Sequence, residues 1–221
     1  MEESLNILIV GATGGTGRAI VERLLHEGHN VTAFSRSANL LESSSERLAT
    51  INGDATNQGD LDQAVRGQDV VIITLGISEN PFRVRFFGAK GTPADVRSVG
   101  TRNVIAAMKK QHVQRLIVQS SYGVGETQGL LRFADQLFFG LILKPQIEDT
   151  ETQERVVRSS GLDWTIAQPV HLTDGDSARL PFLSTKGETR AMKVARQSVA
   201  QALFFTVREP GFIGKSVAIS G

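Results

Sequence analysis

The sequence contains no cysteine among its 221 residues. This absence excludes disulfides, thiolate metal sites, iron–sulfur clusters and a cysteine nucleophile. An excess of charge of one sign is also lacking, because 24 lysines and arginines stand against 23 acidic residues. With a formal net charge of +1, the chain gives no electrostatic sign of a nucleic-acid or membrane-surface partner.

Long hydrophobic runs, clustered histidines and a basic leader sequence are missing as well. The longest apolar run, at 137–143, is far too short to span a membrane. Residues 1–4 lack the basic start of a signal peptide. Three of the four histidines, His26, His29 and His112, fall at expected helix ends, where we expect surface or capping roles. The sequence therefore predicts a cytoplasmic enzyme or binding protein without a metal site.

The sequence alternates between short β-branched runs and helical stretches with an apolar stripe. Its 40% hydrophobic and 21% charged content is ordinary for a globular protein, and its length favours a single domain over residues 1–221. This alternation is typical of the Rossmann-type, doubly wound α/β fold, in which helices cover both faces of a mostly parallel sheet. The expected strands are 5–10, 31–35, 49–52, 70–75, 116–119 and 164–167, and the expected helices are 18–27, 61–65, 95–111 and 147–160.

Two stretches, 78–94 and 123–145, interrupt the alternation and combine phenylalanines with basic residues. Each follows an expected strand at the carboxyl edge of the sheet, where ligands bind in open α/β folds. We expect them to shape the substrate pocket as lids, or else to pack at the surface of a monomer or weak homodimer. Their basic residues could bind acidic groups of a ligand or form a solvated face: Arg83, Arg85, Lys90 and Arg132.

A glycine-rich loop lies between the first expected strand and the first expected helix. It consists of Gly11, Ala12, Thr13, Gly14, Gly15, Thr16 and Gly17. Gly11 permits a tight turn, Gly14 lets the backbone approach a pyrophosphate, and Gly17 lets the helix pack close to the strand. The helix N-terminus then presents N–H groups and the positive end of its dipole to the phosphates. In this context the loop predicts dinucleotide binding, although its spacing is GxxGxxG rather than GxGxxG.

The end of the second expected strand indicates NADPH/NADP as the cofactor. An acidic residue there would bind the ribose 2′-hydroxyl of NADH. The chain instead has Ser35, Arg36 and Ser37, and the next carboxylate is Glu42. An arginine can pair with a 2′-phosphate, and serine hydroxyls can donate to it. The alternative for Arg36 is a solvated surface side chain.

The chain resembles the atypical short-chain dehydrogenase/reductase superfamily, and within it the group of biliverdin reductase B, flavin reductase and NmrA-like proteins. The resemblance covers nearly the whole chain. Its most specific part is the combination of the TLG motif, the Ser-Ser strand end and Pro-Val-His. The motifs are GATGGTG at 11–17, Arg36, Gly-Asp at 53–54, GQDVVIITLG at 67–76, GTRNVIAAMK at 100–109, QSS at 119–121 and SGLDWTIAQPVH at 160–171, followed by a helix that covers the sheet near the C-terminus.

The resemblance implies roles for particular residues. Asp54 would accept a hydrogen bond from the adenine amino group, although a strand-end turn carboxylate is the alternative. Pro169 and Val170 would contact the nicotinamide carboxamide through their backbone, since a proline leaves its carbonyl free. Ser121 would lie near the nicotinamide and His171 beside the substrate, and these two are the catalytic candidates; the alternatives are structural hydroxyl and loop-histidine roles. The remaining cofactor contacts implied are Ala55, Thr74, Leu75, Gly76 and Ser120.

One feature of the superfamily is missing from the sequence. Classical members use a tyrosine as general acid, with a lysine four residues later that lowers its pKa. The only tyrosine is Tyr122, and Glu126 stands four residues on; the lysine nearest to the expected helix at 147–160 is Lys144. Alcohol oxidation and nucleotide-sugar epimerisation, which need that pair, are therefore not expected.

A reductase of flat, conjugated acceptors does not need that pair. Hydride can pass directly from NADPH to a flavin such as FMN, a biliverdin-like tetrapyrrole or a quinone, while solvent or His171 delivers the proton. We therefore expect an NADPH-dependent oxidoreductase of this type, with a planar small molecule as its partner. The alternatives are an NADP-binding redox sensor of the NmrA-like type without catalysis, and a double-bond or carbonyl reductase for a specific secondary metabolite.

Overall fold

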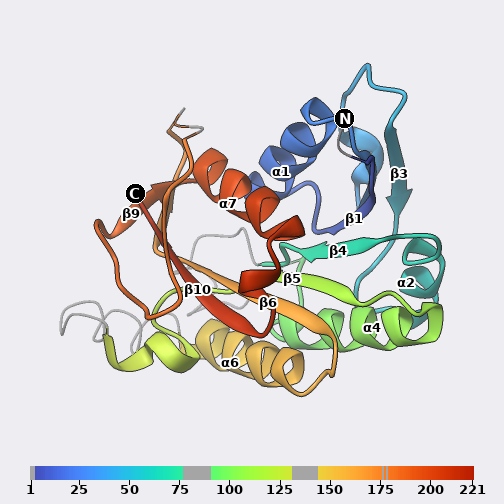
Figure 1. Ribbon diagram of the computed structural model, residues 1–221. Helices are drawn as coiled ribbons and strands as arrows, with labels where there is room; N and C mark the ends of the chain where they lie inside the picture. The colour runs from blue at the N-terminus through green and yellow to red at the C-terminus, as the bar shows by residue number, and fades with distance from the viewer. Residues whose placement is uncertain (1–2, 77–90, 131–143, 176, 178) are drawn as a thin grey trace.

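The computed structural model describes residues 3–76, 91–130, 144–175, 177 and 179–221 (Figure 1). Most of the two stretches expected to shape the pocket, 78–94 and 123–145, lies outside the described residues. The first part of the described chain contains β1 (Asn6–Val10), α1 (Gly15–His26), β2 (Asn30–Ser35), η1 (Ala38–Leu40), β3 (Leu48–Asn52), α2 (Gln58–Ala64) and β4 (Val70–Ile73). The middle part contains α4 (Val96–Gln111), β5 (Arg115–Gln119), η2 (Gly125–Leu130), α6 (Lys144–Arg158) and β6 (Asp163–Pro169).

The strands of the described chain form an eight-stranded sheet in the order β3-β2-β1-β4-β5-β6-β10-β8, in which β8 (Phe182–Ser184) and β10 (Lys215–Ser220) come from the C-terminal region. Neighbouring strands are parallel except for the antiparallel pair of β10 and β8 at one edge. This arrangement confirms the predicted Rossmann-type doubly wound fold. The order reverses between β1 and β4, which leaves a crevice at the carboxyl ends of these two strands.

The central strands are buried on both faces. In β1, Ile7 and Ile9 belong to one hydrophobic cluster, and Leu8 and Val10 to the other. This alternation follows from the two-residue period of a strand, and explains why the sequence shows continuous apolar runs there. Figure 1 shows α1 and α7 (Arg196–Arg208) on one side of the sheet, and α2, α4 and α6 on the other. The two-sided core holds the strand ends rigidly, and the loops beyond them form the site.

The C-terminal region contains elements that the sequence did not predict. These are β7 (His171–Thr173), β8 (Phe182–Ser184), β9 (Lys193–Ala195), η3 (Pro210–Phe212) and β10 (Lys215–Ser220). The helix in this region, α7 (Arg196–Arg208), was expected from the family resemblance. Strands β7 and β9 are three residues each and pair in parallel as a separate small sheet. Runs this short carry no readable periodicity, so only tertiary pairing defines them.

His29 is a correction to the sequence prediction. We expected a surface or capping residue, but its side chain is almost fully buried. Its Nδ1 accepts a hydrogen bond of 3.2 Å from the Leu5 N–H, and its ring lies 6.0 Å from that of Phe204 on α7. The reason is that α7 packs across the turn between α1 and β2, which the local sequence does not reveal.

Candidate functional site

A cleft of about 260 Å³ lies at the reversal point of the sheet. The loops after β1, β2, β3 and β4 contribute its walls, as expected for the carboxyl edge of an open α/β sheet. Ten of the predicted cofactor residues meet there. They are Gly11, Thr13, Gly14, Gly15, Arg36, Asp54, Ala55, Thr74, Leu75 and Gly76.

The glycine loop has the close packing that its sequence predicted. Gly11 adopts φ +94°, a conformation that favours glycine, and its amide donates to the Phe34 carbonyl at 2.9 Å. A Cβ on Gly17 would overlap the Gly11 carbonyl oxygen and lie 3.0 Å from the backbone carbon of Ala12. Helix α1 therefore starts close against β1, at Gly15 rather than at the predicted residue 18. Thr16 and Gly17 are buried behind the cleft and do not line it.

The N-terminus of α1 suits a phosphate group. Its N-cap is Gly14, which provides no capping side chain, and the first turn contains no acidic residue. The first N–H groups of any helix lack partners within the helix, so here they are available to an anion beside Gly14 and Gly15. A Cβ on Gly14 would have only the Gly11 carbonyl oxygen nearby, at 3.4 Å, which leaves room for a ligand at this point.

Arg36 and Asp54 lie at the far end of the same cleft. The Arg36 guanidinium donates to the Gly91 carbonyl and to the Thr92 hydroxyl, the latter at 3.0 Å. Asp54 Oδ1 accepts from both the N–H and the hydroxyl of Thr56, at 2.8 Å each. The Thr56 N–H bond is the main reason that the pKa of Asp54 lies below its usual value, so the carboxylate is ionised at neutral pH. Asp54 thus forms the turn considered as the alternative, while its side chain also lines the cleft.

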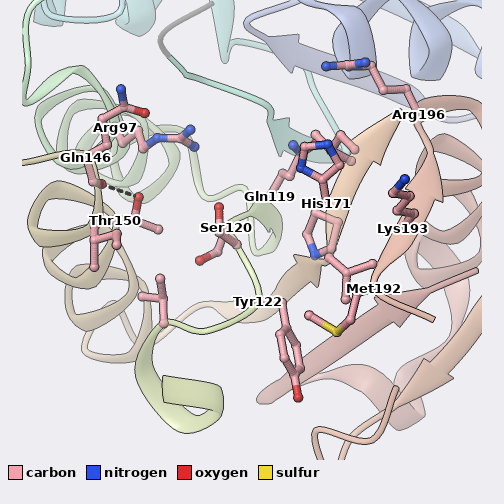
Figure 2. Close-up of a pocket in the computed structure, with 16 residues that line it drawn as sticks. Arg97, Gln119, Ser120, Tyr122, Gln146, Thr150, His171, Met192, Lys193 and Arg196 are labelled. Atoms are coloured by element: carbon pink, nitrogen blue, oxygen red, sulfur yellow. Dashed lines mark hydrogen bonds between the residues drawn. The ribbon is translucent and has the colours of Figure 1, made fainter. Parts of the chain in front are cut away.

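A second, larger cavity of about 570 Å³ lies beyond β5 and β6 (Figure 2). It contains both catalytic candidates, Ser121 and His171, together with Ser120, Pro169 and Val170. We call it the acceptor cavity. Tyr122 and Gln119, which the sequence analysis named without a site role, also line it. The sequence did not single out the other described lining residues: Arg97, Val124, Gln146, Ile147, Thr150, Leu172, Met192, Lys193 and Arg196.

The two cavities adjoin at Arg97. Its Nη1 donates to the Leu75 carbonyl at 2.7 Å, and its guanidinium would lie 2.9 Å from a Cβ on Gly76, which lines the dinucleotide cleft. Burial lowers the pKa of Arg97, and nearby Asp149 opposes this effect. The side chain stays charged because arginine does not deprotonate in proteins. A dinucleotide in the cleft would therefore reach the acceptor cavity past this fixed cation.

The polar side chains at the end of β5 have different partners. Ser120 Oγ donates to the buried Glu154 carboxylate, which also accepts from Gln168 Nε2 at 2.9 Å and from Arg158 Nη1 at 2.8 Å. The Ser120 hydroxyl thus belongs to a structural network. By contrast, Gln119 Oε1 is buried and has no hydrogen-bond partner among the described residues, although the side chain lines the acceptor cavity. The Oε1 atoms of Gln68, Gln153 and Gln168, which do not line this cavity, share this property.

The prediction for Pro169 needs correction. We expected its carbonyl to be free for a carboxamide, but it accepts a 2.9 Å hydrogen bond from the Tyr122 N–H. The Val170 N–H is likewise used, because it donates to the Ile219 carbonyl at 3.0 Å. The first bond continues the pairing of β6 with β5 past the end of β5, and the second continues its pairing with β10, a strand that the sequence did not predict.

Known proteins resemble this chain in sequence and in fold. A family model described as NAD(P)H-binding matches residues 11–210. The chain belongs to this NAD(P)H-binding family. Solved structures of short-chain dehydrogenase/reductase type superpose on nearly the whole chain, which confirms the predicted fold. Binding of NAD(P)H is therefore a property of the family.

Three similar proteins illustrate the family. An uncharacterized chloroplastic protein of Arabidopsis thaliana is 31% identical over 170 residues, which cover 74% of this chain and 58% of that protein. A short-chain dehydrogenase/reductase of Veillonella parvula in complex with NADP has a TM-score of 0.82 at 20% identity and covers 99% and 95% of the two chains. ChuY, an anaerobilin reductase of Escherichia coli O157:H7, has a TM-score of 0.75 at 21% identity and covers 97% and 96%. The similarity to the Veillonella parvula protein and to ChuY, at 20% and 21% identity, shows a shared fold.

This member of the NAD(P)H-binding family lacks the tyrosine–lysine arrangement of classical short-chain dehydrogenases/reductases. Tyr122 is buried, and its hydroxyl donates to the Gly187 carbonyl at 3.0 Å, so it points away from His171 (Figure 2). Helix α6 contributes Gln146, Ile147 and Thr150 to the cavity wall, none of which can act as a general acid. The Thr150 hydroxyl donates to the Gln146 carbonyl at 2.7 Å.

Two further findings concern the described part of the chain. No group of three or more histidine, aspartate or glutamate side chains there could hold a metal ion. Nor is any described helix long and apolar enough to cross a membrane.

Proposed function

We propose that this protein is an NADPH-dependent reductase that passes hydride to a flat, conjugated acceptor, namely a flavin such as FMN, a biliverdin-like tetrapyrrole or a quinone. One observation carries the proposal: a cavity of about 570 Å³ adjoins the dinucleotide cleft, while the Tyr122 hydroxyl is bonded to the Gly187 carbonyl. A carbonyl substrate needs an acid to protonate the alkoxide that hydride addition creates. A conjugated ring spreads the added charge and can take its proton from water.

The residues of the cleft fit NADPH. The open N-terminus of α1 beside Gly14 suits the pyrophosphate, and Asp54 suits the adenine amino group. Arg36 lies where a 2′-phosphate would be expected, and its present partners are a backbone carbonyl and a hydroxyl rather than a carboxylate. A phosphate would therefore gain a charge-assisted bond without first breaking an ion pair. When bound, NADPH supplies the hydride.

Residues of the acceptor cavity orient the acceptor and supply its proton. Ser121 and His171 line the same cavity as Gln119. The unpaired Gln119 Oε1 can accept from a ring N–H of a flavin or tetrapyrrole, or from the nicotinamide carboxamide. The exposed imidazole of His171 can donate a proton to the reduced ring, or water can replace it. The likeness to ChuY, named as an anaerobilin reductase, supports a tetrapyrrole among the candidate acceptors.

The test is acceptor-dependent oxidation of NADPH by the purified protein, followed by the loss of absorbance at 340 nm. FMN, FAD, biliverdin and menadione are compared, with the Gly14→Ala variant as a folded control that binds the cofactor poorly. We expect turnover with at least one acceptor in the wild type, and much slower turnover in the control when NADPH is kept below the control's Kd. His171→Asn should lower kcat by about tenfold or less, since water can substitute for the imidazole.

The same missing acid favours one alternative of a different class. A dinucleotide-binding redox sensor needs the cleft around Gly11 and Arg36 but no acid at all. If the protein binds NADPH and reduces none of the four acceptors, the reductase proposal fails and the sensor is the better description. Equal affinity for NADH and NADPH would remove the assignment to NADPH.

A further inference from the structure

The charge of the acceptor cavity is one-sided. Its described lining residues include Arg97, Lys193, Arg196 and His171, but no aspartate or glutamate. The whole chain carries a formal net charge of only +1, so this is a local concentration and not a general basicity. Positively charged groups that line a partly enclosed cavity raise the local concentration of anions.

Two of these cations lie on the small sheet and the helix that follows it. In the parallel pairing of β7 and β9, His171 is the register partner of Lys193, and both side chains are exposed at the cavity. Val194 and Ala195 are buried next to Lys193, and Arg196 begins α7 directly after them. Figure 2 shows His171, Lys193 and Arg196 on one side of the cavity and Arg97 on the opposite side.

Arg196 lies at the border with the glycine loop. A Cβ on Gly15 would be 2.6 Å from Arg196 Cδ, so the stem of this arginine covers the loop. Its guanidinium pairs with Asp174, whose side chain is 89% exposed. Exposed ion pairs contribute little free energy, so a ligand anion can compete with Asp174 for this guanidinium. Lys193 lies farther from the loop, since it lines the acceptor cavity and not the cleft.

On the basis of the proposed reductase function, we propose that the physiological acceptor carries an acidic group, a carboxylate or a phosphate, and that Lys193 and Arg196 bind it. Arg97 on the opposite wall adds to the positive potential. Such an acceptor is flat and conjugated at one end and anionic at the other. The conjugated part then faces Ser121 and Gln119, away from the two flexible cations.

The test compares acceptors that share a ring system and differ in charge. Riboflavin and FMN differ by a phosphate, and biliverdin dimethyl ester and biliverdin differ by carboxylates. A hydrogen bond to a charged group contributes enough for a change of about 10- to 100-fold. We expect the wild-type kcat/KM to favour the anionic member of at least one pair by this factor. Which pair responds identifies a phosphate or a carboxylate.

Substitutions test whether Lys193 and Arg196 cause the preference for anionic acceptors. In Lys193→Gln and Arg196→Gln the ratio between anionic and neutral members should fall toward one. Lys109→Gln removes an exposed charge in the last turn of α4, outside the acceptor cavity, and should keep the wild-type ratio. The Kd for NADPH is measured for each variant, because an Arg196 that served only the cofactor would change this Kd and leave the ratio unchanged. That result would overturn the assignment of Arg196.

The outcomes separate this inference from the function on which it rests. Turnover of the neutral and anionic members at equal kcat/KM overturns the anion site and leaves the reductase intact. Absence of turnover with every acceptor counts against the reductase. In that case, quenching of flavin fluorescence by the NADP-loaded protein measures the affinity for FMN and riboflavin directly, and equal affinities refute the anion site.

Discussion

Alanine substitutions at Gly17 and Gly14 should have opposite consequences, although the two residues are three positions apart in one loop. In Gly17→Ala the new Cβ would overlap the Gly11 carbonyl oxygen and lie 3.0 Å from backbone atoms of Ala12. These are backbone atoms, which cannot rotate away, so α1 must move from β1. Overpacking of this kind costs typically ~1–3 kcal/mol, and the rigid neighbours place this case near the upper end. At roughly 2–4 °C per kcal/mol for a chain of this size, Tm should fall by about 6–12 °C.

Gly14→Ala should leave the fold nearly unchanged. Gly14 has φ −68° and ψ 163°, which alanine adopts readily, and its Cβ would have only one neighbour, at 3.4 Å. Loss of a glycine N-cap costs a few tenths to ~1 kcal/mol, and the reduced freedom of the unfolded chain returns ~0.4–1 kcal/mol. The methyl group would, however, occupy space beside the N-terminus of α1 where a phosphate must approach. We expect a Tm close to that of the wild type and at least a tenfold weaker affinity for NADPH.

Thermal unfolding followed by circular dichroism, with and without NADPH, measures both effects. A ligand present at 100 times its Kd stabilises the native state by about 2.7 kcal/mol, so NADPH should raise the Tm of the wild type by several degrees. Gly14→Ala should lose most of this gain, and Gly17→Ala should be destabilised even without ligand. A Gly17→Ala variant as stable as the wild type would falsify the packing argument. A Gly14→Ala variant that binds NADPH normally would place the pyrophosphate elsewhere.

Three further predictions concern single side chains. Arg36→Ala should raise the Kd for NADPH by about tenfold or more and that for NADH by less than about twofold, because only NADPH carries the phosphate; an equal change in both titrations contradicts the assignment. Tyr122→Phe loses the bond to the Gly187 carbonyl and should cost ~0.5–1.5 kcal/mol in urea unfolding while kcat stays within about twofold, whereas a large loss of kcat would identify this hydroxyl as an acid after all. Glu154→Leu removes the acceptor of the Arg158, Gln168 and Ser120 bonds, and should destabilise the protein by ~3–5 kcal/mol; a neutral effect on unfolding would show that the network tolerates an apolar replacement.

The sequence predicted the features that depend on local pattern. Apolar runs such as Leu8–Val10 are continuous because β1 is buried on both faces, and this continuity revealed the parallel strands. The boundaries were less accurate. Helix α1 starts at Gly15, inside the loop, because glycines hide the helical periodicity on which the prediction rested. Helix α6 starts at Lys144 rather than at residue 147.

The acceptor cavity was the least predictable part of the site. Its wall combines Gln146 and Thr150 of α6 with Lys193 and Arg196, which lie about fifty residues further along the chain. None of these side chains belongs to a recognisable motif. Arg97 could have been suspected from its place at the start of an expected helix beyond the fourth strand. Lys193 could not, because nothing in a three-residue strand indicates that its register partner is His171.

The sequence alone determined the class of fold and the family of cofactor. The glycine loop and the strand before it are close together in the chain, so their local pattern is enough to identify a dinucleotide-binding motif. Steric fit between Gly17 and Gly11 and the open helix N-terminus are local properties of that segment. Tertiary structure decided what faces the acceptor. The Val170 N–H is bonded to the unpredicted strand β10, and the Tyr122 hydroxyl is bonded to the Gly187 carbonyl. The pairing of β7 with β9 places His171 beside Lys193. These contacts join segments distant in sequence, and such contacts leave no periodic trace in the chain itself.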